Sequence, residues 1–413
     1  MAEGAIAQSR LQQTFAALKY RNYRLWFFGQ MVSLMGTWMQ STAQGYLIYE
    51  LTHSPAFLGA VGFASGIPTW LFMLYAGVVA DRVPRRTLIM ITQTGMMILA
   101  FILAALTFVK IIQPWHILVL AFLLGIANAF EAPARMAFVT EMIDNREDLT
   151  NAIALNGTMF NSATAVGPAV AGLAYAALGP EWCFTINGIS FIAVIAALSM
   201  MNLQPFTPPP HRRSALADLI EGLRYVAARP IVRVLVGLGG VVTLFGMSFV
   251  TLTPAWAVKI LGGDAATNGL LQSARGLGAL MSALFIASLG RFKFKGKLLT
   301  LGMFAFPALL IVFAFVRYLP LALILLVAMG FAQVLTFNLN NALVQMQTPD
   351  MLRGRVMGIY SFTFFGFMPL GALIAGTAAE RIGEPNTVVL GAAITLAFAA
   401  IVWIFAPKLR AME

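Results

Sequence analysis

The stretch that decides the fold is Gly77-Val-Val-Ala-Asp81-Arg82-Val-Pro84-Arg85-Arg86, a short charged loop. Uncharged runs flank it, residues 55–80 before it and residues 87–109 after it. Each run exceeds the ~20 residues that a helix needs to cross the ~30 Å hydrocarbon core of a bilayer. The loop is therefore predicted to join two transmembrane helices at a membrane surface.

The rest of the chain repeats this pattern. Of its 413 residues, 60% are hydrophobic and only 10% are charged, whereas a soluble domain carries about 25% charged residues. The spans must be helical because lipid offers no partner for an open strand edge. The sequence predicts an all-α integral membrane protein of about twelve transmembrane helices: 25–51, 55–80, 86–109, 114–134, 151–178, 183–203, 231–258, 267–290, 298–316, 320–343, 356–379 and 387–406.

Basic residues indicate the orientation of these spans. With the N-terminus inside, the inner segments hold 22 of the 27 Lys and Arg residues and the outer loops hold 4, and Arg275 remains within a span. Such a bias predicts that both termini lie in the cytoplasm. Topology and anionic lipid explain the net charge of +11, so no nucleic-acid partner is expected.

The longest predicted inner connection, residues 204–230, divides the chain into halves of six spans, 1–203 and 231–413. It begins with a proline-rich stretch and continues as a short helix for which Ser214 is a suitable N-cap. One face of that helix is apolar, which predicts that it lies on the membrane surface. The residues of this face are Leu216, Ile220, Leu223 and Val226.

The two halves are predicted to be repeats. An offset of 204 residues superimposes three glycines of span five on three glycines of span eleven: Gly167, Gly172 and Gly179 on Gly371, Gly376 and Gly383. Internal repeats are typical of secondary transporters, whose substrate site lies near the midplane between them.

The charged loop resembles the signature G-x-x-x-D-R-x-G-R-R/K of the major facilitator superfamily, with Pro84 in place of the second glycine. The resemblance implies two pseudo-symmetric six-helix bundles. Gly77 allows close helix contact, and Asp81 can face the N-terminal dipole of a neighbouring helix. The basic residues that hold the cytoplasmic edge are Arg82, Arg85 and Arg86.

The same resemblance implies a role for Glu131, near the inner end of span four. In the family a carboxylate there pairs with the second arginine of the loop, here Arg85, and forms a gating relay with Asp81. Arg135, one helical turn from Glu131, is an alternative local partner.

Span five carries a second signature. Residues 163–172 resemble the antiporter motif G-x-x-x-G-P-x-x-G-G through Gly167, Pro168 and Gly172, while two of its glycines are alanine here. In the family this motif marks exporters that exchange substrate for protons, and simple packing through small residues is the alternative. The arginine typical of span four in that group is absent, because Ala121 occupies its place.

Three further runs, residues 49–55, 131–135 and 149–156, are similar to the bacterial drug:proton antiporter branch that includes the enterobactin exporter and macrolide efflux pumps. This resemblance implies export of a small amphipathic organic molecule, with protons as the coupling ion. The alternatives are a facilitator or uptake permease, or a lipid or lysolipid flippase of the same fold.

Polar residues within the spans are the candidates for a substrate cavity, and helix–helix hydrogen bonds are the alternative for each. Trp38 and Tyr46 of span one could stack on a flat ligand. In span ten the polar face consists of Gln333, Thr336 and Asn340. In span one it consists of Gln30, Ser33, Thr37, Gln40, Ser41 and Gln44.

Charged residues within the spans are energetically costly to insert into a membrane, and their presence therefore suggests a function. A central arginine such as Arg275 costs at least ~2.5–3.5 kcal/mol on insertion scales, which predicts that it holds an anionic substrate group or a carboxylate. Glu50 and Glu131 are the proton-coupling candidates, because a coupling group must be ionisable and partly buried. Glu50 could instead fix the outer end of its helix.

Other classes of protein find little support. A single cysteine, Cys183, permits no internal disulfide, and the three scattered histidines predict no metal site and no cofactor. The segment from Gly290 to Leu298 has the wrong spacing for a phosphate-binding loop. No paired catalytic set is visible, so we expect no enzyme but a monomeric transporter whose other partners are protons and membrane lipid.

Overall fold

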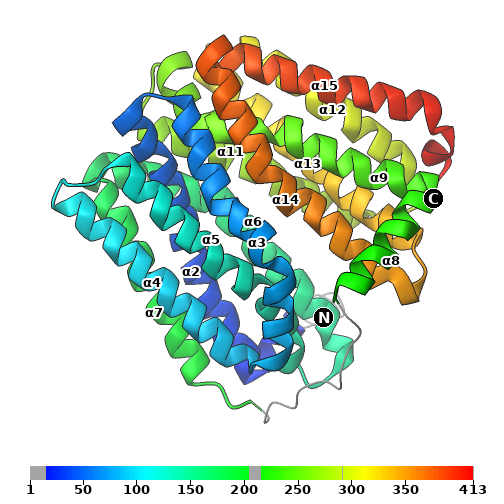
Figure 1. Ribbon diagram of the computed structural model, residues 1–413, viewed down its shortest axis with the longest axis horizontal. Helices are drawn as coiled ribbons and strands as arrows, with labels where there is room; N and C mark the ends of the chain where they lie inside the picture. Colours follow the sequence, from blue (N-terminus) through cyan, green and yellow to red (C-terminus); the bar gives the residue numbers. More distant parts are fainter. Residues whose placement is uncertain (1–14, 204–214, 291, 413) are drawn as a thin grey trace, which may run out of the picture.

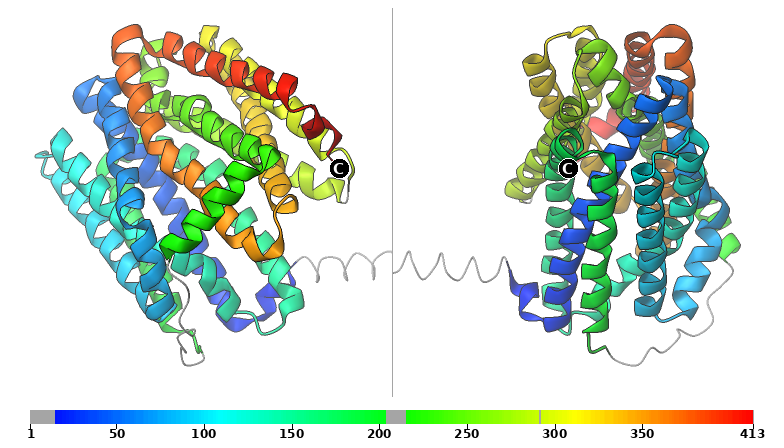
Figure 2. Two further views of the ribbon diagram at one scale, coloured as in Figure 1. Left: turned by 45° about the vertical axis from the view of Figure 1, so that its right-hand side comes forward. Right: turned by 90° about the vertical axis from the view of Figure 1, so that its left-hand side faces the viewer.

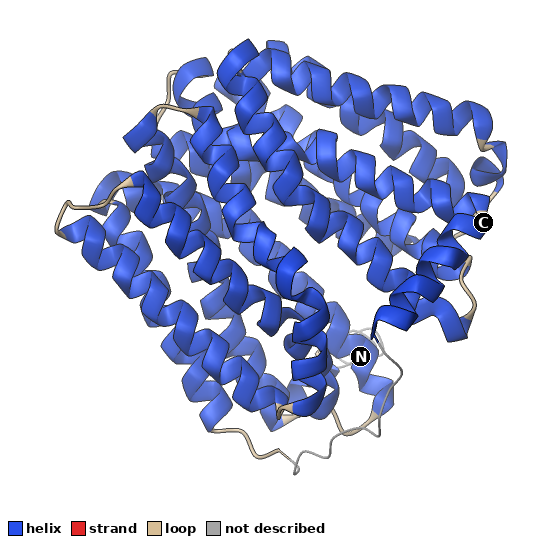
Figure 3. Cartoon of the chain, viewed as in Figure 1, coloured by secondary structure: helices blue, strands red, loops and turns tan. Residues whose placement is uncertain are grey.

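The computed structural model describes residues 15–203, 215–290 and 292–412. These residues form helices and connecting loops, with no strand among them (Figure 3). Each predicted span coincides with a helical segment, which confirms the fold class. The segments are α2 (Arg21–Thr52), α3 (Pro55–Arg82), α4 (Arg85–Phe108), α5 (Pro114–Phe138), α6 (Arg146–Leu178), α7 (Pro180–Ser199), the chain from α9 (Pro230–Val241) to Ile260, α11 (Ala265–Leu289), α12 (Lys295–Phe315), α13 (Leu319–Met346), α14 (Asp350–Ile382) and α15 (Glu384–Phe405).

Length and composition make 10 of these segments able to cross a membrane. The two segments outside that set are α2 and α6, which carry the polar stripe of span one and many small polar residues. Large apolar side chains remain exposed around the bundle, for example Ile91 (63%) and Phe405 (80%). Such exposure is expected for a perimeter that faces lipid.

Span seven is the irregular one. After α9 the chain makes a π-helical turn, η3 (Val242–Gly246), a 3-10 turn, η4 (Met247–Leu252), the short α10 (Thr253–Ala255) and a second π-helical turn, η5 (Trp256–Ile260). Pro254 lacks the N–H that would bond the carbonyl of Val250, and the hydroxyl of Thr253 donates to that carbonyl instead at 2.7 Å. Its counterpart in the first half, α2, is one continuous helix.

The spans form two bundles, α2–α7 and α9–α15, which meet at one end and diverge toward the other (Figures 1 and 2). The first half contacts the second chiefly through α3 against α14 and α6 against α11. We call the end where the bundles meet the closed end; it carries the connections at residues 53–54, 179, 261–264 and 383. The opposite end, the open end, carries η1 (Ala16–Lys19), the connection at 83–84 and the C-terminus.

The predicted amphipathic helix is present as α8 (Ala215–Ala228) at the open end. Ser214, its proposed N-cap, lies outside the described residues. Val226 is buried, while Ile220 and Leu223 are 42% and 49% exposed. Arg355 of α14 anchors this helix by ion pairs with its carboxylates, Asp218 at 2.8 Å and Glu221 at 2.7 Å.

Candidate functional site

Two equivalent glycines bring the bundles into contact at the closed end. A Cβ atom added at Gly172 of α6 would lie 2.5 Å from the carbonyl oxygen of Ala265 in α11. A Cβ atom added at Gly376 of α14 would lie 2.5 Å from the carbonyl oxygen of Pro55 in α3. The two glycines are related by the 204-residue offset, so the repeat seen in the sequence reappears as equivalent packing.

The helix that carries the antiporter-like motif lies in this interface. Pro168 leaves the carbonyl of Thr164 without its helical donor, and a Cβ atom added at Gly276 of α11 would lie 2.5 Å from that oxygen. One turn further, the backbone N–H of Ala169 donates to Ser273 Oγ at 2.8 Å. The motif thus packs one half on the other, and its link to protons stays a prediction.

The contact between α3 and α14 ends near the middle of the spans. Trp70 is the last anchor, with its indole N–H donating to the carbonyl of Gly366 at 2.8 Å. Beyond it a Cβ atom added at Gly77, Gly354 or Gly358 would meet nothing within 4 Å. The close helix contact expected at Gly77 is therefore wrong for this conformation, because the bundles have already diverged at that depth.

The charged loop does not make the ion pair that the resemblance implied. Arg85 pairs with Glu141 and not with Glu131. The reason is the short turn η2 (Val139–Glu141), which folds back after α5 and brings the carboxylate of Glu141 to the start of α4. Arg86 donates to the carbonyls of Ser199 at 2.9 Å and Met201 at 3.3 Å, and so closes the end of α7. Arg82 is exposed and Asp81 is half-buried.

Glu131 is a buried carboxylate inside the first bundle, with 3% of its surface exposed. It accepts hydrogen bonds from Gln93 Nε2 at 2.9 Å and Thr92 Oγ1 at 3.2 Å, both on α4. Arg135 Nη1 lies 3.8 Å from its Oε1, which confirms the local alternative. The ionisable carboxylate of Glu131 is therefore surrounded by hydrogen-bond donors inside the bundle and does not face lipid.

The polar stripe of α2 separates into two groups. Thr37 and Ser41 are exposed. The other members, Gln30, Ser33, Gln40 and Gln44, are buried. Gln40 accepts a hydrogen bond from Asn187 Nδ2 of α7 at 2.7 Å, so for this residue the helix–helix alternative is correct. An asparagine within the apolar span six was the signal for this contact, and sequence reasoning missed it.

The aromatic residues of α2 already have ring partners. Trp38 packs edge-on against Phe160 with ring centroids 5.9 Å apart, and Tyr46 against Tyr175 at 5.0 Å.

The polar face of α13 lies inside the second bundle. Gln333, Thr336 and Asn340 are each at most 3% exposed. Asn340 Nδ2 donates to the carbonyl of Leu235 in α9 at 2.9 Å, and Thr336 Oγ1 to the carbonyl of Ala332 at 2.8 Å. Asn340 therefore ties α13 to α9, whereas the hydrogen bond of Thr336 stays within α13. Gln333 and Asn340 are buried in this conformation and do not line an open cavity as we expected of them.

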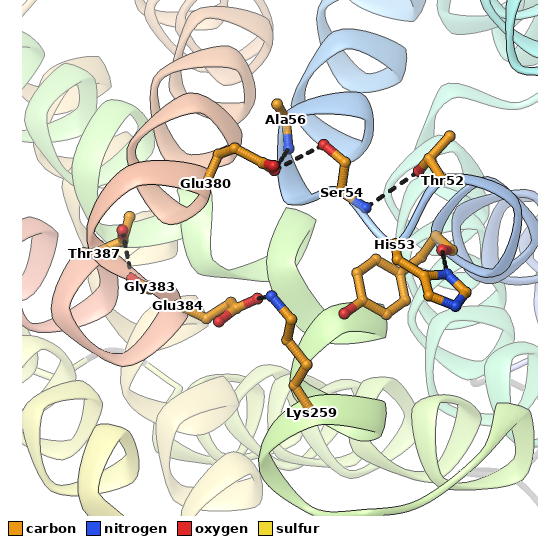
Figure 4. Close-up of polar contacts among 10 residues, drawn as sticks. Thr52, His53, Ser54, Ala56, Lys259, Glu380, Gly383, Glu384 and Thr387 are labelled. Atoms are coloured by element: carbon orange, nitrogen blue, oxygen red, sulfur yellow. Dashed lines mark hydrogen bonds and ion pairs between the residues drawn. The ribbon is translucent and has the colours of Figure 1, made fainter.

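A carboxylate of one half caps a helix of the other at the closed end (Figure 4). Glu380 Oε2 of α14 accepts from Ser54 Oγ at 2.7 Å and from the backbone N–H of Ala56, in the first turn of α3, at 3.3 Å. A negative charge at a helix N-terminus is favourable. The nearby pair of Lys259 and Glu384, at 2.9 Å, stays within the second half, so Glu380 is a latch between the halves.

The remaining charged candidates lie in separate places. Glu50 accepts a hydrogen bond from the hydroxyl of Tyr175, within the first half. Arg275 lines a recess in the second half with about 280 Å³ of empty space, a volume that includes its open mouth. The other lining residues are Phe249, Thr253, Trp256, Leu271, Gln272, Phe313 and Leu326.

Comparison with known proteins gives these features a context. A family model described as a transmembrane secretion effector matches residues 12–413. The chain is 26% identical over 395 residues to the multidrug efflux pump Tap of Mycolicibacterium fortuitum, which covers 94% of this chain and 96% of the relative. It is 27% identical over 369 residues to the enterobactin exporter EntS of Shigella boydii, covering 86% and 84%. The fold is similar to that of a bacterial homologue of the lysosomal transporter Spinster, solved inward-facing and unoccupied, with a TM-score of 0.71, 14% identity and coverage of 95% and 98%.

Proposed function

The chain belongs to the transmembrane secretion effector family of major facilitator transporters, and we propose on that premise that it exports a small amphipathic organic molecule by alternating access. The observation that supports this proposal is the packing of the bundles. They touch through glycines at the closed end, while the same helices face open space at the other end. A two-bundle protein with one closed and one open end needs only a rocking motion to expose a central site to either side.

The basic bias of the sequence supports a cytoplasmic location for the open end, and the bacterial relatives support a location in a bacterial inner membrane. In this orientation the structure is inward-facing. The relatives named for efflux and siderophore export suggest that cargo enters from the cytoplasm and leaves at the closed end.

The register of α3 against α14 indicates what the other conformation looks like. The two helices are antiparallel, so residue numbers rise along α3 as the numbers of the facing residues fall along α14. Extending this register beyond Trp70 puts Gly77 opposite Gly358, and Asp81 opposite Gly354 near the N-terminus of α14. The contacts that define the register are Gly59 with Gly376, Gly62 with Ala372 and Gly66 with Pro369.

Transport in proteoliposomes with an imposed pH gradient tests this proposal. An exporter driven by protons accumulates a lipophilic dye against its gradient when the pH gradient is present, and stops when the gradient is collapsed. A facilitator only equilibrates the dye, and a flippase moves a fluorescent lysolipid in place of the dye. Either result would overturn proton-coupled export.

Glu131→Gln or Glu50→Gln should uncouple transport from the pH gradient in at least one of the two variants. Glutamine keeps the shape and one acceptor oxygen but cannot take up or release a proton. We expect pH-driven accumulation to fall about tenfold or more, the size of an ordinary coupling free energy, while counterflow of a neutral substrate survives. Glu181→Gln, at the start of α7, is the control. Full pH-driven accumulation by both variants would exclude these carboxylates as the coupling groups.

Glu380→Gln should loosen the closed end. The substitution removes the charge from the two hydrogen bonds to α3, and a hydrogen bond to a charged group is worth about 1.5–3 kcal/mol, roughly tenfold or more in an opening equilibrium. The measurement is the rate at which an impermeant maleimide, added outside, labels a single cysteine at Ala372 in a Cys183→Ser background. Arg381→Gln serves as control. An unchanged labelling rate would show that Glu380 is no latch.

A further inference from the structure

One charged side chain in the middle of a span has no partner. Arg275 lies in α11, and among the described residues it forms no hydrogen bond or ion pair. Two other basic residues near the closed end of this half have partners: Lys259 pairs with Glu384, and Arg317 donates to the carbonyl of Ala314. A guanidinium within a membrane needs water, an acid or a ligand beside it.

The recess beside Arg275 offers donors and no negative charge. None of its lining residues is acidic. Trp256 is 2% exposed, and its indole N–H has no partner among the described residues. Gln272 Nε2, also in the lining, donates to Asn268 Oδ1 at 3.2 Å. An unpaired buried N–H beside a positive charge is what an anionic group would satisfy.

The backbone is irregular at the same place. The turns η4, α10 and η5 supply Phe249, Thr253 and Trp256 to the lining. Departures from α-helical geometry in a membrane span are found where backbone borders a cavity, and π-helical turns are frequent at functional sites. This third observation does not depend on the charge of Arg275.

We propose that this recess binds the anionic head of an organic ligand, a carboxylate held by Arg275 and Trp256. The inference rests on the proposed transport function and gives its substrate class: organic anions with a flat apolar body. The guanidinium fork matches a carboxylate, and the rings of Trp256 and Phe313, stacked at 4.7 Å with 22° between their planes, provide an apolar wall.

An occupant of the recess would lie beside the contact between the halves. The residue after Arg275 is Gly276, which packs on the backbone of Thr164 in α6. Gly330 of α13 packs still more closely on the carbonyl of Arg275 itself. A shift of the α11 backbone at this point would therefore reach the other half directly, which gives ligand binding a route to the rocking motion.

Binding of sodium benzoate to the purified full-length protein in nanodiscs tests the proposal. Benzamide has the same ring without the charge, and sodium chloride at equal ionic strength tests for a simple halide site. We expect benzoate to bind wild-type protein, benzamide to bind at least about tenfold more weakly, and Arg275→Gln to lose about tenfold to a hundredfold in benzoate affinity. Arg317→Gln, an arginine outside the recess, should bind benzoate as the wild type does.

Equal affinity for benzoate and benzamide, or unchanged benzoate binding by Arg275→Gln, would overturn the inference, as would chloride competing with benzoate at every concentration tested. If Arg275→Gln fails to fold, Trp256→Phe, which keeps the ring and removes the N–H, must weaken benzoate binding for the inference to hold. Transport of a neutral dye is measured with the same protein variants reconstituted in proteoliposomes. Dye transport without carboxylate binding would reject the anion site but would still agree with the proposed transport function. Absence of all transport would reject the proposed function.

Discussion

Gly172→Leu and Gly376→Leu are each expected to abolish transport while leaving the protein folded in the membrane. At both positions an added Cβ atom would lie 2.5 Å from a carbonyl oxygen of the facing helix. Backbone on both sides cannot rotate away as a side chain can, so the bundles must separate at the closed end. Because overpacking costs about 1–3 kcal/mol, the inward-facing population should fall about tenfold or more.

Transport and cysteine accessibility check this expectation together. Both variants should lose substrate accumulation, and a cysteine at Ala372 should become open to an impermeant maleimide from outside. Gly95→Leu is the matched control, since a Cβ atom added there meets nothing within 4 Å and α4 packs mainly within its own half. Normal transport by Gly172→Leu would show that the glycine contact is not needed for closure at that end.

The spans could be predicted from sequence because the physics that selects them is local. An uncharged run of about 20 residues has to be a helix in lipid. The structure moves the predicted ends by a few residues: span one, predicted at 25–51, is Arg21–Thr52, and span six, predicted at 183–203, is Pro180–Ser199. Helices continue into the polar interface because their backbone hydrogen bonds do not depend on the lipid boundary.

Side-chain partners could not be predicted in the same way. The expected pair of Arg85 with Glu131 failed because a three-residue turn after α5, which no hydropathy pattern marks, brought Glu141 closer. The pairing of Asn187 with Gln40 depends on the rotation of two helices about their axes. Choosing between cavity and helix contact for a polar residue requires the packing of its neighbours.

A comparison of the two halves also separates what the sequence predicts from what it does not. The offset of 204 residues predicts that Gly172 and Gly376 are equivalent. In the structure they do pack in the same way, each against a backbone carbonyl of the facing helix. It does not predict that span seven breaks into π-helical and 3-10 turns while α2 stays continuous. Pro254, in the middle of an apolar run, was the one local signal for this difference. The asymmetry matters because the unpaired Arg275 lies beside the broken segment.

Cysteines at Gly77 and Gly358 should cross-link only when the bundles close at the cytoplasmic end, and the cross-link should stop transport until a reductant is added. The extended register of α3 and α14 places these two glycines opposite each other, although in this conformation an added Cβ atom at either meets nothing within 4 Å. A disulfide requires Cβ atoms about 3.5–4.5 Å apart. The bond therefore forms only if the open end closes, and it then locks the outward-facing state.

The experiment uses a Cys183→Ser background and two further pairs. Gly62→Cys with Ala372→Cys joins the halves at the closed end, where a Cβ atom added at Gly62 would lie 2.8 Å from that of Ala372. Because this distance is shorter than the about 3.5–4.5 Å between the Cβ atoms of a disulfide, the two helices must part slightly for the bond to form in the inward-facing protein. The bond should also block transport reversibly. Gly95→Cys with Gly358→Cys is the pair that should never react, because α4 does not face α14. Two mutually exclusive cross-links, each of which stops turnover, are what alternating access requires. Formation of the Gly77–Gly358 bond with full transport retained would mean that the bundles need not separate at the cytoplasmic end, and the rocking mechanism would have to be abandoned.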